Sequence, residues 1–169
     1  MGEDAEGGSP EVLFGRARLA QIAGDEEQAA EAYERANYEA NVSGRKEVAV
    51  ESRIALVRLD LRQGKLPNAA RLLGRTKREA AEALLRPLES EAASLLSEVH
   101  LKRGDAEPTR KAALESIELA SKFSGRPVLV QAYVALGDAE LKLNRKTEAL
   151  NAYKKAAAEL EWIRQSLLP

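Results

Sequence analysis

The chain has no cysteine among its 169 residues, which excludes disulfides, thiolate metal sites and cysteine nucleophiles. It has one histidine, His100, so a histidine-based metal site or catalytic triad would need residues from elsewhere. Aromatic residues make up only 4%, which is low for a β-sandwich or barrel. No apolar run approaches the roughly 20 residues of a membrane span, and the first nine residues lack the features of a signal peptide. We therefore expect a soluble, cytoplasmic protein.

Motifs of catalysis and cofactor binding are also missing. The chain has no P-loop, no glycine-rich dinucleotide turn and no metal-ligand spacing. Glu89, Glu91 and Glu98 lie close together in the sequence, but glutamate is a routine solvent-facing residue and nothing apolar surrounds them as a catalytic acid would require. His100 falls on the inner side of its segment, where we expect a partly buried side chain with a hydrogen-bond partner. The prediction is a protein that is not an enzyme and binds no metal or cofactor.

The abundant residues are alanine, leucine, glutamate, arginine and lysine, which are good helix formers. The net charge of −1 argues against a dedicated nucleic-acid binder. The charge is unevenly spread, because residues 1–41 hold 3 basic and 10 acidic side chains and residues 45–86 hold 11 and 5. Solvated helix faces explain such a distribution, and a surface that attracts a charged partner is the alternative.

Turn signals recur along the chain every 40 residues. They consist of glycine or asparagine, which tolerate the left-handed conformation after a helix end, followed by a polar residue. These are Gly24-Asp25, Gly64-Lys65, Gly104-Asp105 and Asn144-Arg145. About midway between them lie further breaks at 43–45, 86–87 and 124–127. The two aspartates are good N-caps for the helices that follow. Such alternation predicts helix hairpins stacked in sequence.

The segments between these turns have helical periodicity, and none has strand-like alternation. Within 126–143, for example, Val130, Val134, Gly137 and Leu141 follow spacings of three and four residues. Pro87 and Pro108 fall where a first helical turn begins, a position that tolerates proline. The expected helices span residues 10–23, 26–41, 45–63, 67–84, 87–103, 108–123, 126–143 and 146–167.

Two of the units resemble the tetratricopeptide repeat. That pattern has a large residue and then Leu-Gly on the first helix, and Ala-x3-aromatic-x2-Ala on the second. The fourth unit has Tyr133, Leu136 and Gly137, then Ala149, Tyr153 and Ala156; the first has Ala29, Tyr33 and Ala36. Small residues would let two helices cross closely while a ring fills the space beside them. The resemblance implies an all-α fold, a right-handed α-solenoid of four helix-turn-helix repeats.

The middle units match less well. The second has Leu73 in place of the ring and Thr76 in place of the last alanine, and the third has Thr109 and Ala113 where alanine and the aromatic are expected. The period of 40 exceeds the usual 34, as in long-repeat members of the family. We expect a flexible acidic tail over residues 1–9 and one domain over 10–169, with repeats at about 10–44, 45–86, 87–125 and 126–168.

The resemblance implies a protein-interaction scaffold, as part of a larger protein. In this family the first helices of the repeats build a concave groove that binds a partner peptide or helix. The corresponding positions are Phe14, Arg18, Gln21, Glu51, Ile54, Arg58, Arg62, Glu91, Ser94, Glu98, Lys102, Gln131, Val134, Asp138 and Lys142. Arg58 and Arg62 are expected to contact the ligand, and Glu98 with Lys102 to form an opposed pair one repeat on. Glu98 and Asp138 stand where chaperone-binding members begin a carboxylate clamp, which argues against such a ligand.

Two other functions stay open. One is a ligand-sensing segment of a bacterial transcription regulator or signalling kinase, which an enclosed apolar pocket would favour. The other is self-association as a homodimer through the C-terminal helix. There, Ala149, Tyr153 and Ala156 begin an apolar stripe that continues beyond the length the preceding helix can cover. The exposed part is expected to include Leu160, Trp162, Ile163 and Leu167. The alternative is that Trp162 folds back on its own repeat.

Overall fold

A computed structural model describes residues 8–123 and 125–167, and within them the chain forms eight helices and no strand. Each helix agrees with its predicted span to within two residues, and the all-α repeat fold is confirmed. Residues 1–7 of the predicted flexible tail lie outside the described residues. The helices are α1 (Pro10–Ile22), α2 (Glu26–Val42), α3 (Lys46–Arg62), α4 (Leu66–Glu82), α5 (Arg86–Arg103), α6 (Ala106–Ser121), α7 (Arg126–Lys142) and α8 (Lys146–Ser166).

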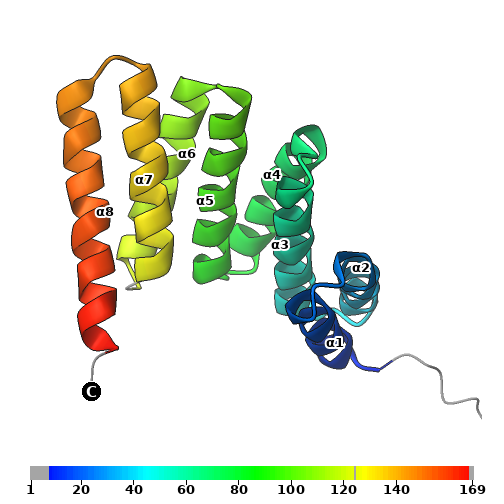
Figure 1. The fold of residues 1–169 in the computed structure, drawn as a ribbon. Coiled ribbons are helices and arrows are strands. Elements are labelled where there is room, and N and C mark those ends of the chain that lie inside the picture. Colours follow the sequence, from blue (N-terminus) through cyan, green and yellow to red (C-terminus); the bar gives the residue numbers. More distant parts are fainter. Residues whose placement is uncertain (1–7, 124, 168–169) are drawn as a thin grey trace, which may run out of the picture. The chain divides into compact units, whose positions relative to one another are not determined.

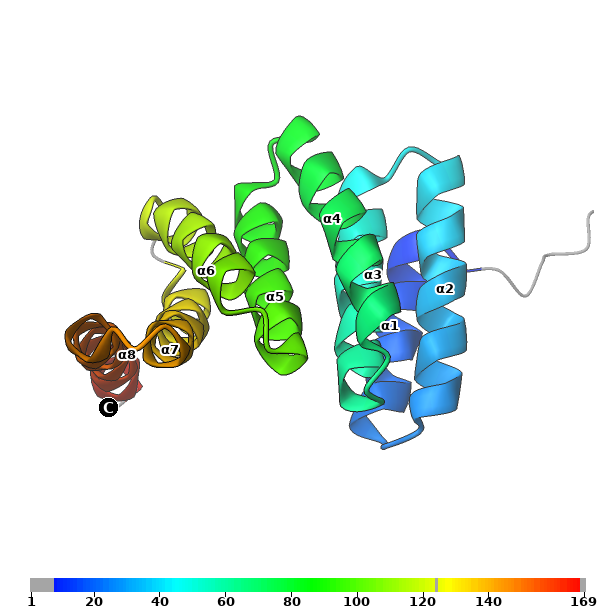
Figure 2. The same ribbon diagram turned by 90° about the horizontal axis from the view of Figure 1, so that it is seen from above.

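The chain divides into two compact units, Met1–Lys65 and Leu66–Pro169. The first contains α1 to α3, and the second contains α4 to α8. In each unit, consecutive helices pack against one another. The second predicted repeat contributes α3 to the first unit and α4 to the second. Within the second unit α5 and α7 run side by side with α6 behind them (Figure 1), as the view from above also shows (Figure 2).

The predicted turns are left-handed at their central residue. Gly24, Gly64, Gly104 and Asn144 have φ of +83°, +73°, +86° and +59°. In each case the following N–H donates to a carbonyl five residues back, as Asp25 N–H does to Ala20 O at 3.0 Å. This bond satisfies a carbonyl that the helix end leaves free. The 40-residue turn spacing is therefore produced by a repeated helix-ending motif.

The two predicted aspartate caps differ. Asp25 Oδ1 accepts a hydrogen bond from Gln28 N–H at 2.9 Å, as expected. Asp105 occupies the N-cap position of α6, as predicted, but its side chain makes no cap hydrogen bond. The residue three positions after it is Pro108, which has no N–H to donate. The Asp105 carboxylate lies instead 3.2 Å from Arg103 Nε, at the end of the preceding helix.

Alanine and glycine lie where helices cross, as predicted. Ala29, Ala69 and Ala149 are at most 1% exposed, and Gly137 is buried. In the first hairpin, Phe14 and Tyr33 pack edge to face with ring centroids 5.4 Å apart. The Tyr33 ring fills the space that the small residues leave, which explains why the repeat pattern combines small residues with an aromatic one.

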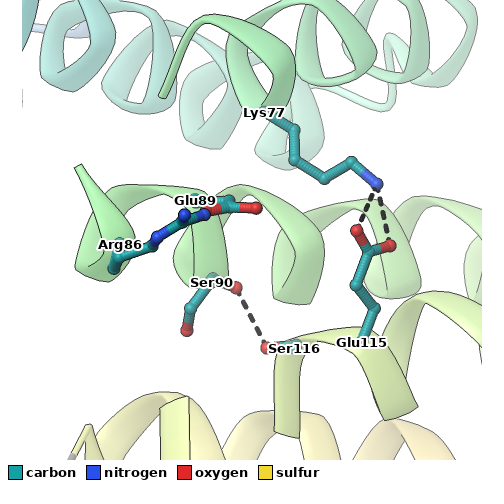
Figure 3. Close-up of polar contacts among 6 residues, drawn as sticks. All are labelled: Lys77, Arg86, Glu89, Ser90, Glu115 and Ser116. Atoms are coloured by element: carbon teal, nitrogen blue, oxygen red, sulfur yellow. Dashed lines mark hydrogen bonds and ion pairs between the residues drawn. The ribbon is translucent and has the colours of Figure 1, made fainter. Parts of the chain in front are cut away.

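Polar contacts add to the packing in the second unit (Figure 3). Lys77 of α4 reaches both carboxylate oxygens of Glu115 in α6, each at 2.7 Å. The Ser116 hydroxyl of α6 donates to the Ser90 carbonyl of α5 at 2.9 Å. Thr76, one of the departures from the repeat pattern, is fully buried and donates to the Leu72 carbonyl at 2.8 Å. Its hydroxyl can replace a small apolar group because it has a partner.

Candidate functional site

A groove runs between α5 and α7 in the second unit. It has a volume of about 260 Å³, and its walls come from two first helices of consecutive repeats. The lining residues follow helical spacing on each wall, so that each helix presents one face to the groove. They are Ser94, Ser97, Glu98 and Leu101 on α5 and Val130, Gln131, Val134, Ala135 and Asp138 on α7.

The groove has a closely packed floor, above which an apolar and a polar side chain are exposed. Ser94, Ser97 and Ala135 are at most 6% exposed, and their small side chains leave room above the α5–α7 contact. Val134 rises from this floor with 41% of its surface exposed, and Gln131 is exposed beside it. An exposed valine in a groove, beside an amide that can donate and accept, is suited to a peptide side chain and its backbone.

Asp138 is held in place by the second helix of its own repeat. The Tyr153 hydroxyl of α8 donates to Asp138 Oδ1 at 2.6 Å. Burial raises the pKa of Tyr153 to about 12, and the hydrogen bond and the charge of Asp138 act in the same direction. The phenol therefore stays protonated at neutral pH and fixes the carboxylate without neutralising it.

The remaining charges near the groove contact the chain itself. Lys102 Nζ lies 3.7 Å from Glu98 Oε1, one helical turn away, so the opposed pair expected from the sequence is present. The Lys142 ammonium donates to the Leu101 carbonyl at 3.2 Å. The groove lining itself contains two carboxylates and no basic residue.

Five of the predicted binding residues meet in this groove: Ser94, Glu98, Gln131, Val134 and Asp138. Lys102 and Lys142 lie beyond its lining, at the ends of α5 and α7. Glu91 is half-buried on α5, one turn before Ser94. Ser94 itself is only 4% exposed, so it contributes to the floor and offers little surface to a partner.

In the first unit, several predicted binding residues take part in the packing. Gln21 Oε1 accepts a hydrogen bond from the Tyr33 hydroxyl at 2.7 Å, and Phe14 packs against the Tyr33 ring. Ile54 is 4% exposed and is part of the interior. Arg62 Nε donates to Glu26 Oε1 at 2.8 Å, so its charge is already compensated. These contacts reduce what the side chains can offer to a ligand.

The other first-unit positions keep more of their surface. Arg18 is exposed, and Glu51 and Arg58 are half-buried.

His100 is partly buried, as predicted, but its hydrogen bonding differs from the expectation. Its Nδ1 lies 3.7 Å from Asp105 Oδ2 and has no hydrogen-bond partner. Among the described residues, no group of three or more potential ligands is placed to hold a metal ion. No helix in the described part of the chain has the length and apolar character needed to cross a membrane.

Two further grooves were not foreseen from the sequence. One lies between α1 and α2, has a volume of about 580 Å³ and includes the exposed Leu19. The other, of about 670 Å³, lies over α4, α5 and α6 and includes Leu114 and His100. Second helices contribute much of both linings, whereas the family pattern directs attention to first helices. The structure exposes Leu19 and Leu114 in these grooves, but single exposed leucines are common and their exposure cannot be read from the sequence.

The C-terminal helix exposes an apolar face. Leu160 is 57% exposed and Leu167 is 78% exposed, and Ile163 is half-buried between them. Trp162 is 50% exposed, and the Arg126 guanidinium of α7 stacks on its ring at 3.7 Å from the centroid. Trp162 thus contacts its own hairpin and remains accessible.

Comparison with known proteins supports the fold. No family model matches the chain, and no curated protein matches it. Among solved structures, the crystal structure of MamA has 18% identity and a TM-score of 0.69, covering 92% of this chain and 81% of that chain. The crystal structure of BtubC (BKLC) from P. vanneervenii has 15% identity and a TM-score of 0.78, covering 95% of this chain and 68% of that chain. With the hairpins described above, these likenesses show that the chain has a helical-repeat fold.

Proposed function

We propose that this chain is a tetratricopeptide-type scaffold that binds a peptide or helix of another protein in the α5–α7 groove. The observation that carries the proposal is the convergence of five family groove positions on one cleft with an exposed valine. Tyr33 and Tyr153 pack against small residues in the hairpins that best match the repeat pattern, which supports the assignment to this type.

The groove has the character of a peptide site. It is open to solvent, its lining is mainly apolar, and polar groups that can bond a peptide backbone lie on both walls. An enclosed apolar pocket would instead favour the sensing of a small molecule. The grooves described above are open to solvent, which favours an extended or helical ligand.

The test is a selection of peptides from a displayed random library against the immobilised 169-residue chain, followed by affinity measurements on two variants. Val134→Lys places a positive charge in the α5–α7 groove, whereas Leu114→Lys places one in the groove over α4, α5 and α6. The two side chains have the same 41% exposure, so the variants are matched. Selected peptides should lose binding to Val134→Lys alone. Loss with Leu114→Lys alone would place the site on α6 and overturn the proposal.

Self-association is a second candidate function, favoured by a specific observation on α8. Residues 40, 80 and 120 are alanines with 0% exposure, and the fourth position of the same 40-residue series is Leu160 at 57%. The last repeat thus has a large exposed side chain where the other repeats have a small buried one. Exposed apolar patches of this kind mark interfaces. A second copy of the chain is the partner we propose for this face.

A further inference from the structure

The charge of the α5–α7 groove indicates which peptides it selects. One carboxylate stands on each wall, Glu98 on α5 and Asp138 on α7, and no lysine or arginine is among the lining residues. A cationic group that enters between the walls would therefore meet negative charge from two sides. The remaining lining residues are neutral, and the apolar ones are Leu101, Val130, Val134 and Ala135.

Neither carboxylate is strongly neutralised by the chain itself. The partner of Asp138 is the uncharged phenol of Tyr153, which engages Oδ1 and leaves Oδ2 for another donor. Lys102 is 3.7 Å from Glu98, and both side chains are nearly half exposed, at 46% and 47%. Exposed pairs of this kind contribute little, so an arginine of a ligand can replace Lys102 at small cost.

The position of Asp138 is fixed before any ligand arrives. Tyr153 belongs to α8, and its ring packs directly on Gly137, the residue before Asp138 in α7. The short hydrogen bond then sets the direction of the carboxylate. A binding group that is already oriented loses less conformational entropy when the ligand binds.

We propose that the groove selects peptide segments in which an aliphatic side chain is flanked by arginine or lysine. The aliphatic group packs on Val130 and Val134, and the cation binds between Glu98 and Asp138. This inference rests on the proposed function and adds the chemistry of the partner to it. It also gives α8 a role in binding, because Tyr153 positions Asp138 without touching the ligand.

The experiment uses three synthetic fluorescent dodecapeptides that differ only at the residues flanking a central leucine: arginine, glutamine or glutamate. Fluorescence anisotropy with the full 169-residue chain gives the affinities at low and high salt. The arginine peptide should bind roughly 10-fold tighter than the glutamine peptide, since a charge-assisted contact is of that order. The glutamate peptide should bind most weakly, and added salt should narrow the differences.

Two variants assign the preference to the groove. Glu98→Gln and Asp138→Asn keep the size of each side chain and remove its charge. Each variant should weaken binding of the arginine peptide by about 5- to 10-fold and leave the affinity for the glutamine peptide unchanged. Glu118→Gln removes an equal charge from α6, where the carboxylate side chain is 74% exposed, and should have no effect. Thermal unfolding of each variant checks that it is folded.

The outcomes separate this inference from the proposed function. Equal affinity for the three peptides, or a preference that survives both groove variants, overturns the charge selection. If one of the peptides binds and Val134→Lys abolishes its binding, the scaffold function stands even when the charge selection fails. If none of the three peptides binds, the charge selection is also overturned, and the peptides from the library selection then decide the proposed function by themselves.

Discussion

Gly137 of α7 lies directly beneath the aromatic ring of Tyr153 in α8. A methyl group at Gly137 would stand 2.7 Å from Cδ1 and Cζ of the ring, closer than carbon atoms approach in folded proteins. The hydroxyl at the far end of the same ring bonds to Asp138, the next residue of α7. One side chain therefore sets both the closeness of the α7–α8 crossing and the direction of a groove carboxylate.

Substituting Gly137 by alanine should destabilise the protein. The added methyl would force the Tyr153 ring or the α8 backbone to move, and overpacking of this kind costs about 1–3 kcal/mol. Part of that cost is offset, because alanine is a better helix former than glycine by about 1 kcal/mol. Urea unfolding followed by circular dichroism would give the difference in unfolding free energy.

Gly74→Ala is the matched control for this substitution. Gly74 lies in the interior of α4, and a methyl group there meets nothing within 4 Å. This variant should gain up to about 1 kcal/mol from helix propensity alone. A Gly137→Ala protein as stable as Gly74→Ala would show that the contact with Tyr153 is loose and that the crossing has room to adjust.

The raised pKa of Tyr153 predicts a loss of stability at alkaline pH. Its pKa is about 12 in the folded chain, above the ordinary value of 10.0, because burial and the Asp138 hydrogen bond favour the neutral phenol. The stabilising contribution of the protonated Tyr153 to the unfolding free energy is therefore fully present below pH 10 and is lost between pH 10 and 12. The unfolding free energy, measured in urea between pH 8 and 12, should fall more steeply with pH for the wild type than for Tyr153→Phe.

The comparison with Tyr153→Phe is needed because other tyrosines behave similarly. Burial also raises the pKa of Tyr33 and of Tyr133, so some alkaline dependence should persist in the variant. Identical slopes for the two proteins would mean that Tyr153 is as accessible to solvent in the folded chain as in the unfolded one.

Glu140 of α7 joins three parts of the second unit. It is 4% exposed, accepts from Arg110 Nε of α6 at 2.7 Å, and lies 3.4 Å from Arg145 Nη1 in the turn before α8. Glu140→Gln would remove the charge that both guanidinium groups face. We expect a loss of about 1–3 kcal/mol, the range for a hydrogen-bonding group left without its charged partner. Glu118→Gln, with its exposed ion pair to Lys122, should change the melting temperature very little.

The turn pattern shows what the sequence can and cannot predict. Glycine or asparagine at 24, 44, 64, 104 and 144 marks left-handed turns, and all were predicted as breaks. Leu84 occupies the same 20-residue series with φ of +58°, but leucine carries no turn signal. The sequence therefore predicts the break at Arg86-Pro87, two residues after Leu84. Leu84 takes part in the same helix-ending motif, in which the Leu85 N–H donates to the Ala80 carbonyl at 2.9 Å, and the local propensity of leucine does not reveal it.

Leu84→Gly should stabilise the protein, because Leu84 has a positive φ that glycine adopts more easily. The side chain is 72% exposed, so little packing is lost, and glycine relieves the steric cost of positive φ. Allowing for the greater freedom of glycine in the unfolded chain, the net gain is about 0.5–1 kcal/mol. Asn144→Gly is a comparison with a smaller expected gain, since asparagine tolerates this conformation. A lower melting temperature for Leu84→Gly would indicate that the leucine side chain contributes to packing.

The candidate groove was predictable in part. The resemblance to the repeat pattern indicates positions on first helices, and the helical spacing predicts that Glu98, Val134 and Asp138 lie on one side of the repeats. The sequence pattern does not reveal that Arg62 forms an ion pair with Glu26, a residue 36 positions away. Nor does it reveal that Tyr153 orients Asp138. Both depend on side-chain rotamers at helix crossings, which a spacing pattern does not determine.

Self-association through α8 is tested by sedimentation. Leu160 and Ile163 lie on the apolar face of α8, one turn apart, and Leu160 is 57% exposed. If a second copy covers this face, the wild-type chain should show a concentration-dependent increase in sedimentation coefficient. The variant with Leu160→Glu and Ile163→Glu should remain monomeric, because burying two carboxylates without partners is unfavourable. Its helical content should be unchanged, since glutamate is a good helix former.

Trp162 supplies an independent measure of the same contact. It is half exposed in the isolated chain, with Arg126 on one face of its ring. Dimerisation should shift its fluorescence to the blue as concentration rises, in step with the sedimentation change. Leu150→Glu is the matched control, because Leu150 is also about half exposed, at 53%, but lies near the start of α8, far from this face along the helix. A wild type that stays monomeric at high concentration, or a Leu150→Glu variant that dissociates as the double variant does, would remove this face as the dimer interface.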